Sequence, residues 1–150
     1  MTDPASSHHP GPRPSAVGAP GHATPMVTGL PRAILRIEGL AVGVAAIMLY
    51  ARMDGPWLLF VLLWLVPDVS SAAYLVGPRT GAMVYNVAHL TAFPLALGLY
   101  GYLGHDARSL QLALIWLSHI GLDRAFGFGL KYASAFKDTH LGRMGAASGR

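Results

Sequence analysis

The distribution of apolar residues divides the chain into a polar N-terminal stretch and a long apolar region. Residues 1–30 are rich in Pro, Gly, Ser and His and show no apolar periodicity, which is typical of a disordered segment. From Ala33 onward, four stretches each approach the roughly 20 residues that a helix needs to cross the hydrocarbon core of a bilayer. These stretches are residues 33–50, 57–76, 82–103 and 110–128.

Turn-forming residues separate the four stretches. Asp54-Gly55-Pro56, the run from Gly77 to Gly81, and Gly104-His105-Asp106 provide three short connections. Short connections favour antiparallel packing of consecutive helices, and no stretch has a polar face that would suit water. We therefore predict an all-α, integral membrane four-helix bundle over residues 31–130, antiparallel and with short loops. Residues 131–150 are predicted to follow it as a cytoplasmic juxtamembrane tail.

Composition supports a lipid environment and narrows the chemistry. Only 12% of the residues are charged, whereas soluble domains carry roughly 25%. The chain has no cysteine, which excludes disulfides and thiolate metal sites. The net charge of +4 comes from basic residues that are scattered singly, so we expect the lipid bilayer and not nucleic acid as a partner.

The basic residues near the ends of the predicted spans indicate an orientation. One side of the bundle would hold Arg32, Arg36, Arg79, Lys131, Lys137 and Arg143, and the other side only Arg52 and Arg108. Basic residues are enriched on the cytoplasmic side of membrane proteins, so both termini are expected to be cytoplasmic.

Glycine and proline positions in the spans suggest how the helices pack. Gly39 and Gly43 are four residues apart, a spacing that allows close approach of a neighbouring helix and is compatible with a homodimer. Pro67 and Pro94 each remove an intrahelical hydrogen bond, so two of the predicted spans are expected to be interrupted.

A few polar residues lie inside the predicted spans, and they are the best candidates for function. An ionisable side chain near the middle of a bilayer costs roughly 2.5–3.5 kcal/mol on insertion scales, so these residues should face inward. At 1.5 Å per residue, they lie about 7–13 Å from the cytoplasmic surface, in one layer of the bundle. The pairs Asn86/His89 and His119/Asp123 each share one helix face. The complete set is Glu38, Asp68, Asn86, His89, His119, Asp123 and Arg124.

Carboxylates and imidazoles on facing helices are the ligands of many metal sites in helix bundles. This ligand set suits a divalent metal such as zinc, iron or manganese, and the metal would reduce the cost of burying the acids. The candidate ligands are Glu38, Asp68, His89, His119 and Asp123, with Asn86, Ser71, Arg124 and His140 as supporting residues. A bound metal would allow hydrolytic or, with iron, redox chemistry.

Other interpretations of the same residues stay open. The cluster is also compatible with a hydrogen-bonded lock between helices, or with a proton or ion relay in a small transporter. The segment after residue 127 is expected to be a basic tail whose lysines meet anionic lipid, although its position would allow His140 to fold over the cluster.

The chain resembles the domain-of-unknown-function 4260 family of small four-span bacterial membrane proteins. The resemblance covers about residues 33–145, and its strongest parts are the run from His119 to Tyr132 and the run from Phe136 to Gly142. Further matching runs are Leu35–Leu40, Pro67-Asp68, Gly77-Pro78-Arg79 and Tyr85–His89. The resemblance implies a multi-pass protein of the bacterial inner membrane, and it implies no activity.

Overall fold

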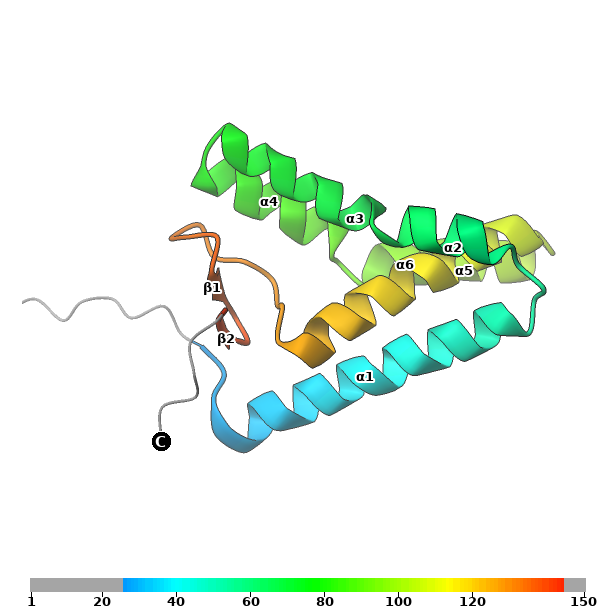
Figure 1. Cartoon of the computed structure of the whole chain (residues 1–150), viewed down its shortest axis with the longest axis horizontal. Coiled ribbons are helices and arrows are strands. Elements are labelled where there is room, and N and C mark those ends of the chain that lie inside the picture. Colours follow the sequence, from blue (N-terminus) through cyan, green and yellow to red (C-terminus); the bar gives the residue numbers. More distant parts are fainter. Residues whose placement is uncertain (1–25, 145–150) are drawn as a thin grey trace, which may run out of the picture.

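A computed structural model describes residues 26–144 of the chain and shows a helical bundle (Figure 1). Most of the predicted disordered segment, residues 1–25, and the last six residues lie outside the described residues. The helices are α1 (Gly29–Ala51), α2 (Trp57–Trp64), α3 (Val66–Val69), the 3-10 helix η1 (Ser70–Leu75), α4 (Pro78–Ala88), α5 (Ala92–Leu103) and α6 (Ala107–Phe126). The predicted all-α, four-helix architecture is confirmed. Residues 26–144 also contain a small antiparallel sheet of β1 (Asp138–Thr139) and β2 (Gly142–Arg143).

Two of the four predicted helices are interrupted next to their prolines, as expected. The second is divided into α2, α3 and η1, and Pro67 lies in the first turn of α3. The third is divided into α4 and α5, and Pro94 lies in the first turn of α5. Proline has no N–H and clashes with the preceding turn, so the helix ends before it and restarts around it. Each break leaves a polar residue, Asp68 or His89, at or near a helix end.

The turn between the second and third helices is shorter than expected. We predicted a connection over residues 77–81, but α4 already begins at Pro78. Gly77 has a φ of 150°, and Pro78 occupies the start of the helix, where its missing N–H has no cost.

Helix α6 is the central element of the bundle (Figure 1). Its main neighbours are α1, α5 and α2, so α1 packs mostly against the last helix and not against the next one in sequence. The buried face of α6 includes Ile115, Ser118, His119 and Asp123. A helix that is covered by other helices can carry more polar residues than one that faces lipid, and this explains the mixed sequence of α6.

The backbones of helices α1 and α6 are in direct contact at three glycines, Gly39, Gly43 and Gly121. A Cβ atom on Gly121 would lie 2.6 Å from the backbone nitrogen of Gly43 and 2.8 Å from the carbonyl oxygen of Gly39. Small residues allow helices in membranes to approach this closely. The Gly39/Gly43 face is therefore occupied by α6 of the same chain.

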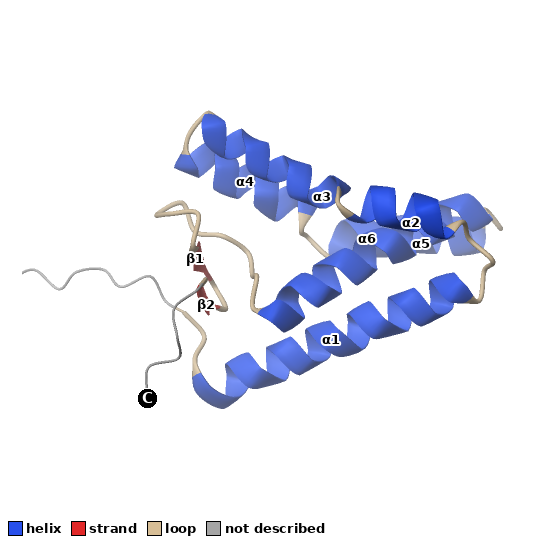
Figure 2. Cartoon of the chain, in the orientation of Figure 1, coloured by secondary structure: helices blue, strands red, loops and turns tan. Residues whose placement is uncertain are grey.

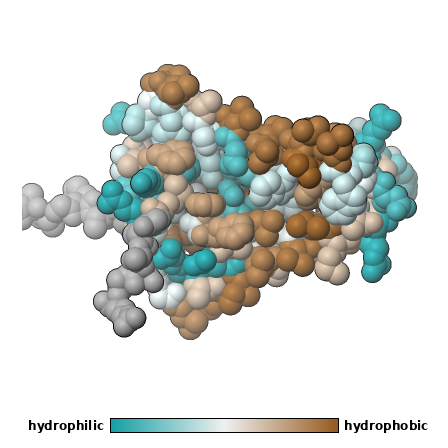
Figure 3. Space-filling view, viewed as in Figure 1, coloured by the Kyte–Doolittle hydropathy of each residue, from teal (hydrophilic) through white to brown (hydrophobic). Residues whose placement is uncertain are grey.

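Three helical stretches are long and apolar enough to cross a membrane: Gly29–Ala51, Trp57–Leu75 and Pro78–Leu103. Helix α6 is not among them, consistent with its central position. Large apolar side chains such as Ile37, Leu58 and Leu62 are exposed on the outer helices. Figure 3 shows apolar surface over the helices and hydrophilic residues gathered toward the two ends. A surface this apolar is suited to lipid and not to water.

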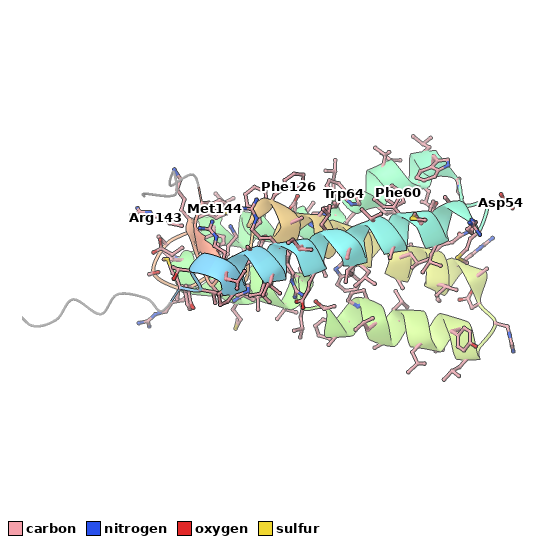
Figure 4. All side chains as sticks on the ribbon, turned by 90° about the horizontal axis from the view of Figure 1, so that it is seen from below. Asp54, Phe60, Trp64, Phe126, Arg143 and Met144 are labelled. Atoms are coloured by element: carbon pink, nitrogen blue, oxygen red, sulfur yellow. The ribbon has the colours of Figure 1, made fainter. Side chains whose placement is uncertain are left out.

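The two ends of the bundle differ in structure (Figures 2 and 4). One end is formed by helix connections that include Asp54, and the opposite end holds Arg143 and Met144 (Figure 4). An apolar core around Tyr50, Phe60 and Ile115 fills part of the bundle. At the Arg143 end, the chain after α6 folds back as the small sheet, and the N–H of Val27 donates a hydrogen bond to the carbonyl of His140.

The glycine contact between α1 and α6 predicts a marked effect of a single methyl group. Replacing Gly121 with Ala places the new Cβ against backbone atoms of α1, which cannot move aside. We expect Gly121→Ala to reduce the stability of the bundle by about 1–3 kcal/mol, the usual range for overpacking. The measurement is the thermal unfolding midpoint of detergent-purified protein, followed by circular dichroism.

Gly98→Ala is the matched control for this substitution. A Cβ at Gly98 would lie 3.4 Å from the Cβ of Ala113, an ordinary contact, so this variant should be as stable as the wild type or more so. Equal midpoints for the two variants would contradict the close approach of α1 and α6.

Candidate metal centre

Four polar residues from three helices converge at one point of the bundle. Asp68 comes from α3, His89 from the C-terminal end of α4, and His119 and Asp123 from α6. Each offers one ligand atom, and these atoms all lie within 4.8 Å of one another. Because His119 and Asp123 are four residues apart, both side chains lie on the same face of α6.

The distances between the histidines and the carboxylates of this cluster are compatible with a metal site. The Nε2 atom of His89 lies 3.5 Å from Asp123 Oδ2 and 3.7 Å from Asp68 Oδ1. The Nε2 atom of His119 lies 3.7 Å and 3.6 Å from the same two oxygens. Hydrogen bonds between nitrogen and oxygen span about 2.7–3.2 Å, so all four distances are too long. A tetrahedral site with metal–ligand bonds of about 2.0–2.1 Å has edges of about 3.3–3.4 Å, which is close to these distances.

The two histidines also face each other directly. Their Nε2 atoms are 3.2 Å apart. Without a metal, one ring can donate a hydrogen bond to the other across this distance. With a metal ion between them, the same distance is one more edge of the tetrahedron.

Tyr85 orients two members of the cluster. Its backbone carbonyl lies 2.9 Å from the Nδ1 atom of His89. Since a carbonyl only accepts, Nδ1 carries the proton, and the lone pair of Nε2 points toward the cluster. The Tyr85 hydroxyl donates to Asp123 Oδ2 over 3.2 Å, and its ring stacks on the His89 ring with a centroid distance of 3.7 Å. Sequence reasoning did not identify Tyr85, although its spacing of four residues from His89 is a usable signal.

Without a cation, the burial of this cluster has a free-energy cost, because its carboxylates carry negative charge. The side chains of His89, His119 and Asp123 are 4%, 0% and 13% exposed, whereas that of Asp68 is 50% exposed. Within residues 26–144, the two histidines are the only ion-pair partners of Asp68 and Asp123. Buried carboxylates are stable only when their charge is balanced, and a divalent cation would balance both.

The segment after α6 is attached to α4 next to this cluster. The side-chain amide of Asn86 donates to the carbonyl of Lys131 over 2.9 Å and accepts from its N–H over 2.7 Å. The Lys131 ammonium lies 4.5 Å from the centre of the Tyr85 ring and donates to the carbonyl of Phe136. Lys131 is only 5% exposed, so the expectation that this lysine meets anionic lipid is wrong. The backbone pairing with Asn86 draws it inside.

Glu38 does not join the other four candidate ligands. The neighbouring Gly39 lies against Arg124. Glu38 lines a cavity that does not include the four clustered residues, together with Arg124 and His140. Arg124 donates to the hydroxyl of Thr91 over 2.7 Å, and the Nδ1 atom of His140 accepts from the N–H of Leu130 over 2.9 Å. Ser71 lies in η1 and is not one of the four clustered residues. Similar depth in the bundle was therefore not sufficient to bring Glu38 to the cluster.

Comparison with known proteins identifies the family. A family model described as Domain of unknown function (DUF4260) matches residues 32–144, about three quarters of the chain. The chain belongs to this family. No curated protein and no solved structure matches it.

The buried position of Lys131 predicts an unusual titration. Burial lowers the pKa of its ammonium to about 8, against a partial opposing effect of the nearby carboxylates of Asp123 and Asp68. The docked segment then binds fewer protons than the released one between pH 8 and pH 10.5, so docking should strengthen as the pH rises through this range. Asn86→Ala removes both hydrogen bonds that hold Lys131, and the pKa should rise toward 10.5.

The measurement is an NMR titration of protein that carries carbon-13 at the Cε atoms of its lysines. The chain has one other lysine, Lys137, and a Lys137→Arg variant assigns the Lys131 signal. A wild-type midpoint at or above the ordinary lysine value would contradict the burial of this ammonium.

Proposed function

We propose that this member of the domain-of-unknown-function 4260 family is a multi-pass membrane protein that binds a divalent metal ion through Asp68, His89, His119 and Asp123. The supporting observation is the set of four nitrogen–oxygen distances of 3.5–3.7 Å between the histidines and the carboxylates. They exceed hydrogen-bond length and agree with the edges of a coordination tetrahedron.

The donor set narrows the choice of metal. Two imidazoles and two carboxylates suit zinc, iron or manganese, whereas calcium and magnesium prefer oxygen ligands alone. The hydrogen bond from His89 to the Tyr85 carbonyl and that from Tyr85 to Asp123 are the outer contacts typical of metal ligands. A cluster that served only to lock helices together would gain more from direct hydrogen bonds at shorter distances.

The uneven burial of the cluster bears on what a bound metal could do. Asp68 is half exposed while the other three ligands are largely buried, so a water molecule or a substrate oxygen can approach the site from the Asp68 side. If a water molecule replaced Asp68 as the fourth ligand, a metal held by the other three residues would supply an activated water. Metal-assisted hydrolysis is the reaction class that such an open site would support.

A proton relay is the second candidate function. The observation that favours it is the distance of 3.2 Å between the Nε2 atoms of His89 and His119, across which a proton can pass. Chains of Asp and His in membrane spans often carry protons. The relay needs no metal, so metal content separates the two proposals.

We further propose that the protein resides in the bacterial inner membrane with both termini in the cytoplasm. Arg36 and Arg79 lie in the first parts of α1 and α4, and Lys137 precedes β1, all on the side of the bundle where the described residues begin and end, against Arg52 and Arg108 on the other. The rule that basic residues accumulate on the cytoplasmic side supports this orientation.

The metal proposal predicts stoichiometric metal in the purified protein. We expect about one zinc, iron or manganese ion per chain by elemental mass spectrometry after purification in detergent without chelator. The double variant His89→Ala, His119→Ala removes two of the four ligands and should lose at least nine tenths of this metal, since losing ligands sharply weakens binding.

His105→Asn is the matched control for metal binding. His105 lies in the exposed α5–α6 connection with a φ of 53°, a conformation that Asn adopts readily. The control should keep its metal. Metal at far below one ion per chain in the wild type, or equal metal in the double variant, would contradict the proposal, and pH-dependent proton flux in metal-free vesicles would then favour the relay.

The orientation predicts the behaviour of reporter fusions. A fluorescent protein fused after Arg150 should be active, because it folds in the cytoplasm, and alkaline phosphatase at the same position should be inactive. Fusions in the Gly104–Asp106 connection should give the opposite pattern. Active phosphatase at the C-terminus would reverse the proposed topology.

A further inference from the structure

A cavity with a volume of about 510 Å³ lies apart from the four clustered residues. It is bounded by α1, α6, the start of α5 and the segment after α6. Its lining is mostly apolar, but four polar residues contribute to it: Glu38, Thr91, Arg124 and His140. A cavity with apolar walls and a few converging polar groups is the usual form of a ligand site.

Two of the residues that line this cavity, Arg124 and His140, can donate hydrogen bonds. The guanidinium of Arg124 uses one nitrogen to donate to Thr91, and within residues 26–144 it has no carboxylate within 4.0 Å. Its other N–H groups are therefore available to a ligand. The Nδ1 atom of His140 accepts a hydrogen bond from the N–H of Leu130, so a neutral His140 carries its own proton on Nε2 and is a donor. Together these groups suit a phosphate.

Glu38 brings the opposite charge to the same cavity. It lies on α1, one residue from Gly39, and among the described residues no basic group forms an ion pair with it. A lone carboxylate and a lone guanidinium therefore line one cavity within a membrane bundle, yet they do not pair with each other. Glu38 is exposed and Arg124 is partly buried, so a ligand that carries both charges can pair with each of them at this cavity.

The polarity of the cavity changes along the helix axes. Val42 is four residues beyond Glu38 on α1, which is about 6 Å further from the end of the bundle where α1 begins. Leu117 is seven residues before Arg124 on α6, about 10 Å away in the same direction. The charged residues of the cavity thus lie toward this end of the bundle, together with Leu35 and Leu141, and the rest of the apolar lining lies toward its middle. An amphiphile in a bilayer has the same arrangement of headgroup and chain.

We propose that this cavity binds a phospholipid of the surrounding bilayer whose headgroup carries a phosphate and a primary ammonium, with the phosphate at Arg124 and His140 and the ammonium at Glu38. A primary ammonium donates hydrogen bonds to a carboxylate, whereas the quaternary ammonium of a choline headgroup is recognised by the rings of Trp, Tyr or Phe, and none of these lines the cavity. An anionic headgroup such as phosphoglycerol would leave Glu38 unpaired.

The test is native mass spectrometry of the full chain in detergent with three phospholipids of identical chains: phosphatidylethanolamine, phosphatidylcholine and phosphatidylglycerol. We expect phosphatidylethanolamine to bind about tenfold more tightly than the other two, the effect of one charge-assisted hydrogen bond. Glu38→Gln should remove this preference and leave the binding of phosphatidylglycerol unchanged. Arg124→Gln should weaken all three lipids about tenfold.

Matched controls are available at the opposite end of the bundle. Asp54→Asn and Arg108→Gln change one acid and one base in exposed positions near the α1–α2 and α5–α6 connections, and neither should alter lipid binding. Soluble phosphoethanolamine at the lipid concentration should not displace the lipid, because it cannot fill the apolar part of the cavity.

Equal binding of the three lipids by the wild type would overturn the proposal, as would an unchanged preference in Glu38→Gln. Displacement by soluble phosphoethanolamine would assign the cavity to a small metabolite and would also overturn it. If Arg124→Gln fails to fold, the Glu38→Gln comparison still decides. Metal content should be unaffected by Glu38→Gln, so the outcome is independent of the metal proposal.

Discussion

The close contact between the backbones of α1 and α6 is the constraint on which the rest of the structure depends. Three glycines, Gly39, Gly43 and Gly121, allow it, and the contact covers one side of the most polar helix. With α1 on this side and α5 and α2 on others, His119 and Asp123 can stay buried in a membrane bundle. The same crossing keeps Glu38 away from the clustered residues, because the position next to it is in contact with Arg124.

Pro67 and Pro94 interrupt two helices and thereby position two of the four clustered residues. Without the interruptions near Pro67 and Pro94, Asp68 and His89 would lie on the sides of continuous helices. Instead, His89 lies at the end of α4, and the hydrogen bond from its Nδ1 to the Tyr85 carbonyl fixes the orientation of its ring. The cost of each lost backbone hydrogen bond is limited because short helical segments restart at once on either side.

Much of the fold follows from the sequence, because length, apolarity and turn residues determine helices in a bilayer. The pairing of His119 with Asp123 follows from helix periodicity, and the approach of Asp68 and His89 was predicted from their depth. Depth carries no information about rotation around a helix axis, which explains why Glu38 was grouped with them. The attachment of Lys131 to Asn86 could not be predicted. The Asn86 side chain bonds to the backbone N–H and carbonyl of Lys131, groups that nearly every residue type carries.

The interrupted helices also have a mechanical consequence. Helices η1 and α4 form a hairpin that packs mainly on itself, and α6 makes its main contacts with α1, α5 and α2. Asp68 and His89 lie at the base of this hairpin, next to the two breaks, while His119 and Asp123 lie on α6. A ligand held by both pairs would connect the hairpin to α6, so its binding would fix the position of the hairpin relative to the rest of the bundle.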